Sequence, residues 1–302
     1  MIIDTPLWNI SNEEGLETAA STVYEPAEDT FLMLDALQLD LEHIVIDRLT
    51  CQNKAVADPC LKRGLLLVVE LGCGAGLLTA AVGKALHSCE SVGVHCLAVD
   101  VNPAACHATA QTCQLNGVQV DVIRGDLLTW MRHFEPTNAI SDHSNVYGPI
   151  DILLFNPPYV RGPDGEPALS PTTTKIDQKD QVAQDQLLSI MADAAWLGGG
   201  PDGVDVLKRA LHQAADLLSE QGVFYALMID YNYRALVRDE MEARQKWTTN
   251  NDIIYKKTSA DDVILTTFGS NSTNRPLACH KILSRHVPGE RLAVYRIYRP
   301  HI

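Results

Sequence analysis

Residues 151–160, DILLFNPPYV, place an asparagine, two prolines and a tyrosine directly after a run of apolar residues. Proline lacks a backbone N–H and fixes its own φ, so the strand that the apolar run predicts over 150–155 ends there. The Asn156 amide can donate and accept hydrogen bonds, and Tyr159 offers a flat aromatic face. With the rigid Pro157 and Pro158, these side chains could hold a planar amide or amino group; the alternative is a buried structural turn.

A glycine-rich turn follows a second apolar run. Residues 64–71, GLLLVVEL, have the length and composition of a buried strand, and Gly72, Gly74 and Gly76 follow before a helical pattern. Glycine lets the backbone adopt positive φ and approach a ligand closely. The N-terminus of the next helix presents free N–H groups to an anionic group. Alone, G-x-G-x-G is also compatible with a simple turn between strand and helix.

Two acidic residues follow the next two predicted strands. Asp100 lies at the end of the strand predicted over 95–101, where a carboxylate can accept hydrogen bonds from both hydroxyls of a ribose. Asp126 follows the strand predicted over 118–123 and could bind an adenine amino group or cap a helix. The carboxyl ends of parallel strands meet at one edge of a sheet, so these acids and the glycine-rich turn would hold an adenosine there, beside Asn156.

The strands that must position these residues alternate with helical patterns, which is typical of a parallel sheet covered by helices on both faces. A fifth parallel strand is predicted over 222–229. Residues 280–287 and 291–299 flank Pro-Gly-Glu and are expected to form an antiparallel hairpin. The alternating pattern of 118–123 predicts a half-exposed strand at the edge of the sheet.

Helix boundaries are marked by capping residues and glycines. Helices are predicted over 26–39, between Asn102-Pro103 and Asn116-Gly117, and from Asp202 until Gly222. Four stretches lack clear periodicity, and we expect inserted loops there, near 41–62, 134–149, 161–186 and 248–279.

The composition excludes several classes of protein. A formal net charge of −14 argues against a broad nucleic-acid-binding face. The eight cysteines include no C-x-x-C pair, so reduced thiols are expected rather than a metal site or disulfide framework. No apolar run approaches the roughly 18 residues of a membrane span, and the N-terminus lacks a signal-peptide pattern. We therefore expect a cytoplasmic protein, with the nucleus as a further compartment, that binds neither metal nor membrane.

The glycine-rich turn, the acidic strand ends and the N-P-P-Y tetrad together resemble the motifs of class I S-adenosylmethionine-dependent methyltransferases. Within that class the chain is similar to the eukaryotic HemK-type family, which methylates the glutamine of the GGQ motif in class 1 peptide-release factors. The resemblance implies a Rossmann-like α/β fold with a mostly parallel seven-stranded sheet and a C-terminal antiparallel hairpin. It implies an N-terminal extension, 1–22, and a single methyltransferase domain, 23–302. It rests on residues 23–37, 68–76, 100–103, 155–160 and 194–210.

Matching positions in the family's motifs imply roles for single residues. Asn156, Pro157, Pro158 and Tyr159 would be the catalytic group that holds the substrate amide. Tyr24 and Glu28 would belong to the segment over the methionine end of the cofactor, and Trp196 and the Gly198–Gly200 run would lie beside the site. The implied contacts to S-adenosyl-L-methionine or its immediate surroundings are Thr30, Glu70, Gly72, Gly74, Gly76, Asp100, Asp126, Leu127 and Asn156.

The resemblance also implies protein partners. The eukaryotic members work with a small zinc-binding activator subunit, and the edge strand near Val118–Ile123 is the expected surface of a heterodimer. Val118, Val120 and Val122 are expected to be exposed there, with Asp121 as the single charge. A cover from one of the long loops is the alternative.

Other activities stay open at this point. Adenine-N6 and guanine-N2 nucleic-acid methyltransferases use a similar tetrad, protein lysine is a further acceptor as main or side activity, and a catalytically silent cofactor-binding scaffold is a third alternative. The acidity and the match at 23–37 argue against a nucleic-acid substrate, and the intact N-P-P-Y tetrad argues against a silent scaffold, whereas a lysine acceptor stays open. The expected chemistry is an in-line displacement in which Asn156 and a main-chain carbonyl orient the acceptor nitrogen.

Overall fold

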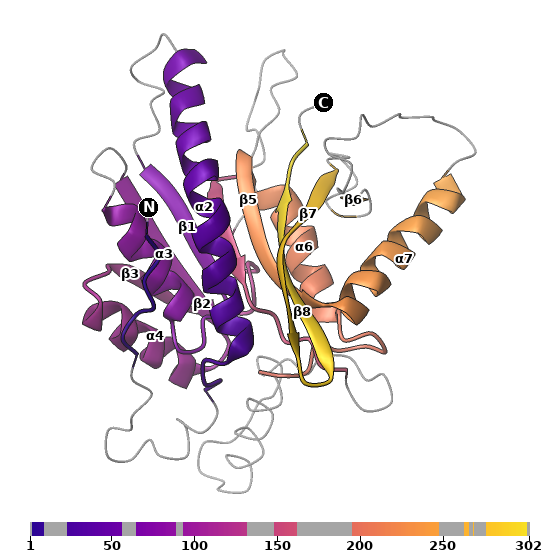
Figure 1. Ribbon diagram of the computed structural model, residues 1–302, viewed down its shortest axis with the longest axis horizontal. Helices are drawn as coiled ribbons and strands as arrows, with labels where there is room; N and C mark the ends of the chain where they lie inside the picture. Colours follow the sequence, from indigo (N-terminus) through magenta and orange to yellow (C-terminus); the bar gives the residue numbers. More distant parts are fainter. Residues whose placement is uncertain are drawn as a thin grey trace, which may run out of the picture.

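In a computed structural model, the chain forms one mixed sheet flanked by helices (Figure 1). The structure describes residues 2–8, 23–55, 65–88, 93–131, 148–161, 195–247, 263–265, 268 and 276–300, with only the helical backbone over 43–55 and 243–247. Within these residues the sheet has eight strands in the order β3-β2-β1-β4-β5-β8-β7-β6.

Five strands of the sheet are parallel and three follow in antiparallel order, which confirms the predicted fold class. β8 pairs antiparallel with β5, β7 pairs with β8 as the predicted hairpin, and the short β6 pairs with β7. β3 lies at the edge, as predicted. The strands are β1 (Leu65–Leu71), β2 (Gly93–Asp100), β3 (Val120–Arg124), β4 (Ile150–Phe155), β5 (Leu218–Ile229), β6 (Val263–Leu265), β7 (Leu277–Val287) and β8 (Glu290–Tyr298).

Helices bury both faces of the sheet. One core cluster joins α2, α3 and the end of α4 to one face, and another joins α6 and α7 to the opposite face. Successive residues of β5 alternate between them, since Phe224 packs in the second cluster and Tyr225 in the first. The helices are α2 (Glu28–Ala55), α3 (Leu77–His87), α4 (Pro103–Leu115), α6 (Asp205–Leu217) and α7 (Asp230–Trp247).

The caps predicted for α4 are present. The Asn102 side chain accepts a hydrogen bond from the Ala104 N–H at 2.9 Å, and Pro103 occupies the first turn. Gly117 follows the helix with φ 70°. Because an asparagine cap and an N-terminal proline each satisfy a local backbone requirement, these boundaries could be read from the sequence.

The C-terminal ends of two helices were predicted wrongly. Helix α2 continues through residues 41–55, where a loop was expected. Leu41, Ile44, Val45 and Leu49 recur at helical spacing, and no proline or glycine intervenes before Pro59. Helix α6 ends at Leu217, before Gly222, because the chain turns into β5 at Leu218.

The region 248–279 is not irregular throughout, since it contains β6 and the start of β7. The short β6 is an eighth strand, one more than predicted, and it pairs with the first residues of β7. The loops predicted near 134–149 and 161–186 lie almost wholly outside the described residues. No helix of the described ranges has the length and apolar character that crossing a bilayer requires.

Candidate active site

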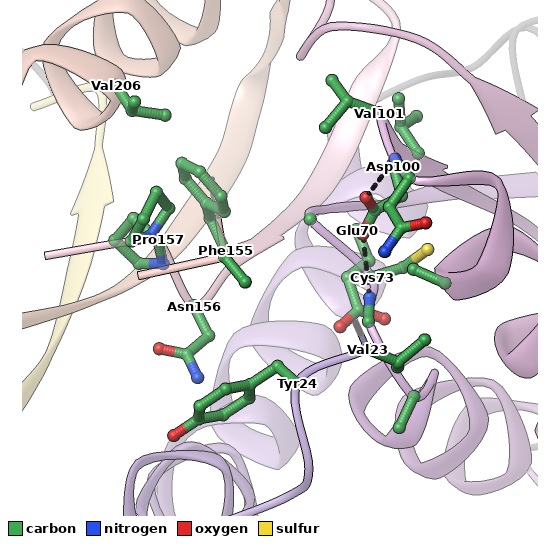
Figure 2. Close-up of a pocket in the computed structure, with 18 of the residues that line it drawn as sticks. Val23, Tyr24, Glu70, Cys73, Asp100, Val101, Phe155, Asn156, Pro157 and Val206 are labelled. Atoms are coloured by element: carbon green, nitrogen blue, oxygen red, sulfur yellow. Dashed lines mark hydrogen bonds between the residues drawn. The ribbon is translucent and has the colours of Figure 1, made fainter. Parts of the chain in front are cut away.

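A cavity lies at the carboxyl ends of β1, β2 and β4, beside the loop that follows β3. Figure 2 shows Asn156 and Pro157 on one side of it, Glu70, Cys73 and Asp100 on the other, and Tyr24 near Asn156. The structure thus brings together every residue that the sequence assigned to catalysis or to the cofactor. These are Thr30, Glu70, Gly72, Gly74, Gly76, Asp100, Asp126, Leu127, Asn156, Pro157, Pro158 and Tyr159.

Glu70 joins the end of β1 to the first turn of α3. Its carboxylate accepts hydrogen bonds from the Thr79 N–H, at 2.8 Å, and from the Thr79 hydroxyl. Burial raises the pKa of Glu70 to about 8, and the two bonds from Thr79 oppose that rise. Glu70 therefore joins the residues before the glycine-rich turn to the helix after it, and it also lines the cavity.

Asp100 stabilises the same turn through hydrogen bonds to the backbone. One carboxylate oxygen accepts from the Gly74 N–H at 3.0 Å, and the other accepts from the Asn102 N–H at 2.9 Å. Burial raises the pKa of the Asp100 carboxyl, and these backbone donors oppose the rise. Each oxygen of a carboxylate can accept a second hydrogen bond, so the side chain retains capacity for a ligand in the cavity.

The glycines of the turn adopt conformations that suit glycine. Gly72, Gly74 and Gly76 have φ of 56°, 51° and 79°. A Cβ on Gly76 would lie 2.7 Å from the Thr109 Cα, so this glycine also lets α4 approach the turn. A Cβ on Gly72 would lie 3.2 Å from the Phe155 ring. The turn is thus held tightly between β4 and α4.

A cation that the sequence analysis missed lies beside Asp126. Arg209 of α6 lines the cavity and forms an ion pair with the Asp126 carboxylate. Leu127, the next residue, has φ 50° and is the non-glycine with positive φ among the described residues. This strained backbone turns the loop after β3 toward the cavity. Arg209 follows Val206, another lining residue, at a spacing of one helical turn, but no local pattern marks it as part of a site.

Asn156 presents an unsatisfied acceptor. Its Oδ1 is buried and has no hydrogen-bond partner among the described residues. Buried polar atoms are normally hydrogen-bonded, and leaving one unpaired costs about 1–3 kcal/mol. An orphaned oxygen in a cavity is therefore suited to accept an N–H group from a ligand.

An aromatic cluster closes the same end of the cavity. The Tyr24 hydroxyl donates to Asp29 at 2.7 Å, and the Tyr159 hydroxyl donates to the same carboxylate oxygen at 3.5 Å. Burial and this carboxylate raise the pKa of both phenols, so the two tyrosines stay neutral at physiological pH. The Trp196 ring packs edge-on against Tyr24 with a centroid separation of 4.8 Å.

Two further expectations have different outcomes. Glu28 does not line the cavity and instead forms an ion pair with Arg285 of β7 at 2.9 Å. The Gly198–Gly200 run lies beside the site, since the Gly198 N–H donates to the Val160 carbonyl at 2.8 Å. Asp29 was missed, although it directly precedes Thr30 in the sequence.

Comparisons with known proteins find relatives that match most of the chain. No family model matches the chain. It is 28% identical over 227 residues to "Methyltransferase HEMK2" of Mus musculus, covering 74% of this chain and 78% of the relative. A solved structure of the E. cuniculi Mtq2-Trm112 complex aligns with 17% identity and a TM-score of 0.44, covering 92% of this chain and 99% of the matched chain.

A relative from Schizosaccharomyces pombe shows the family to which the chain belongs. The chain is 30% identical over 210 residues to "eRF1 methyltransferase catalytic subunit mtq2" of Schizosaccharomyces pombe, covering 70% of this chain and 74% of the relative. With the mostly parallel sheet and the cavity at its carboxyl edge, this similarity shows that the protein belongs to the HEMK2/Mtq2 family of class I methyltransferases.

Proposed function

We propose that the protein transfers a methyl group from S-adenosyl-L-methionine to the side-chain amide of glutamine in the GGQ motif of a class 1 release factor. The observation that supports this most directly is the buried Asn156 Oδ1 without a partner among the described residues. A primary amide offers N–H donors to that oxygen and a carbonyl acceptor to the Asn156 NH₂ group. Asn156 and a glutamine amide are therefore complementary.

The cavity fits the proposed methyl donor. The Asp100 carboxylate is suited to the ribose, because both of its oxygens lie at the sheet edge with unused lone pairs. Asp126 and the Leu127 backbone would hold the adenine, and Thr30 and the glycine-rich turn would hold the methionine portion. When bound, S-adenosyl-L-methionine supplies an electrophilic methyl group on a positively charged sulfur.

The chain's own residues would make the weak amide nucleophile reactive by position. The Asn156 Oδ1 and a main-chain carbonyl of the Pro157–Pro158 turn would accept the two amide N–H groups and direct the nitrogen lone pair into the cavity. The same acceptors would stabilise the positive charge that develops on the N–H groups. Tyr159, held at its hydroxyl by Asp29, would keep the planar amide in place.

The names of the relatives support the substrate and a partner. The Schizosaccharomyces pombe relative is named for eRF1, and a Methanocaldococcus jannaschii relative is named a putative protein N5-glutamine methyltransferase. We propose that a small zinc-binding activator pairs with the edge strand β3, and that the heterodimer works in the cytoplasm.

The predicted exposure of the valines on the edge strand needs one correction. Val118 is buried, with 6% exposed, because it packs against Gly83 of α3, and Val120 is partly covered by the same core cluster. Val122 is partly exposed and belongs to neither of the two main core clusters. What the edge offers a partner is therefore mainly its unpaired backbone, since among the described strands only β2 pairs with β3.

Parallel methylation assays test the proposal. The chain, with and without an activator subunit, is incubated with labelled S-adenosyl-L-methionine and a release factor, the same factor with GGQ changed to GGA, a lysine-rich protein, or RNA. We expect label only in the release factor with the intact glutamine. Asn156→Ala should reduce the rate by about 10² or more, as loss of a transition-state hydrogen bond does. Label in the RNA, or turnover by Asn156→Ala within tenfold of wild type, would contradict the proposal.

A further inference from the structure

The cavity contains a buried carboxylate to which the chemistry above assigns no direct contact with substrate. Asp29 lies in the first turn of α2, and 3% of its surface is exposed. A helix N-terminus is a favourable place for a negative charge. Burial of a charged group nevertheless requires several hydrogen-bond donors. Those of Asp29 come from two segments of the chain: Tyr24 and Thr30 beside it, and Tyr159 after β4.

The two oxygens of Asp29 serve different sides of the cavity. Oδ1 accepts from the Thr30 N–H at 2.6 Å and from the Thr30 hydroxyl at 3.3 Å. Oδ2 accepts from the Tyr24 hydroxyl at 2.7 Å and from the Tyr159 hydroxyl at 3.5 Å. Thr30 belongs to the side proposed for the methyl donor, whereas Tyr159 belongs to the tetrad proposed for the acceptor.

A second route links Asp29 to the acceptor side through Tyr24. The ring of Tyr24, fixed by its short bond to Asp29, packs edge-on against Trp196 at 4.8 Å. The Trp196 carbonyl accepts from the Val160 N–H at 2.9 Å, directly after the tetrad. Asp29 is thus connected to the Asn156–Tyr159 turn by two routes. One runs directly through the Tyr159 hydroxyl, and the other runs through the rings of Tyr24 and Trp196.

We infer that Asp29 is a positioning residue that fixes the distance and angle between the donor side and the acceptor side of the cavity. The inference rests on the proposed methyl transfer. A displacement needs the nucleophile in line with the departing group, and a misplacement of about 1 Å can cost about 10² in rate. One carboxylate that holds Thr30, Tyr24 and Tyr159 together limits such displacement without touching the reacting atoms.

The test replaces the carboxylate by an amide of the same shape. Asp29→Asn keeps one acceptor oxygen and replaces the other by an NH₂ group, so either the Thr30 N–H loses its acceptor or the two tyrosine hydroxyls lose the carboxylate oxygen that they share. We expect kcat for a release-factor substrate to fall at least about tenfold, as loss of alignment would give. The Kd of S-adenosylhomocysteine, measured by calorimetry, and the Kd of a fluorescent GGQ peptide should each stay within about threefold, because no hydrogen bond to either ligand is removed.

A double-mutant cycle separates positioning from general damage. Tyr24→Phe removes one hydroxyl and should lower kcat about threefold to tenfold, the value of one hydrogen bond. If Asp29 acts through Tyr24, the double variant should lie within about twofold of Asp29→Asn alone. Asp35→Asn is the matched control, because Asp35 lies on the same helix, is 55% exposed and pairs with Arg285 outside the cavity. It should keep wild-type kcat.

The outcomes distinguish this inference from the function on which it rests. A wild-type protein that leaves glutamine unmodified overturns both. A wild-type protein that methylates glutamine, together with an Asp29→Asn variant of unchanged kcat, overturns the inference alone, and so do fully additive losses in the cycle. If Asp29→Asn does not fold, Tyr24→Phe decides, and an unchanged kcat in that variant counts against the inference.

Discussion

At the scale of single residues, Asp100 combines a structural role in the glycine-rich turn with a proposed binding role toward the ribose. Its oxygens hold the Gly74 and Asn102 N–H groups at 3.0 and 2.9 Å, so Asp100→Ala would also release the glycine-rich turn. Asp100→Asn keeps the shape and one acceptor. We expect calorimetry with S-adenosylhomocysteine to show a Kd about tenfold to a hundredfold higher, since charged hydrogen bonds contribute about 1.5–3 kcal/mol. Asp121→Asn, on the exposed face of β3, is the control, and equal Kd values for the two variants would refute the ribose contact.

Several of the residues that the sequence identified are placed by the strand pattern itself. Gly72, Asp100 and Asn156 each end or follow a buried strand, so their position at the sheet edge follows from the strand pattern alone. Asp29 and Arg209 could not be assigned in this way. Asp29 bonds locally to Tyr24 and Thr30, but its link to the acceptor side runs to Tyr159, 130 positions later. Arg209 reaches Asp126 from a helix 83 positions later. Such contacts depend on how helices pack on the sheet, which no short pattern encodes.

At the scale of elements, the close packing of α4 on the glycine-rich turn predicts that Gly76→Ala destabilises the protein more than Gly117→Ala, although the two glycines have similar φ. Gly76 has φ 79° and Gly117 has φ 70°. A Cβ on Gly76 would lie 2.7 Å from the Thr109 backbone, whereas a Cβ on Gly117 meets nothing within 4 Å. Gly117→Ala should therefore cost about 1–2 kcal/mol of unfolding free energy from backbone strain alone. Gly76→Ala should cost clearly more, because α4 must also move, and equal losses in denaturant unfolding would contradict this account.

The elements predicted with least error include helix α4 and the buried strands β1 and β4, whereas β5 begins four residues before its predicted start. β4, Ile150–Phe155, coincides with its predicted range because an apolar run ends there at the Pro157-Pro158 pair. The short β6 was missed, because a strand of three residues carries too little pattern and is defined by its pairing with β7. The extension of α2 was missed because polar residues within 41–55 were taken for a loop despite helical spacing.

At the scale of the whole molecule, the edge of β3 that none of the described strands pairs with predicts a contact with a partner. Val122→Lys places a charge on a partly exposed position of this strand, outside the two main core clusters. If the proposed activator adds a strand there, the variant should lose co-purification with it while its melting temperature changes little. Leu39→Lys introduces the same charge on α2, at a side chain that is 57% exposed, and should keep the partner. An activator retained equally by both variants would place the interface elsewhere.

The position of β8 in the sheet has a consequence for the growing polypeptide. β8 is the last of the eight strands in the chain, yet it lies between β5 and β7 and pairs with both. Until the ribosome has delivered it, β5 has an open edge and its buried residues, such as Tyr225, lack their final cover. Open edges and exposed apolar surface attract other chains. We therefore expect the nascent protein to bind chaperones between the synthesis of β5 and the synthesis of β8.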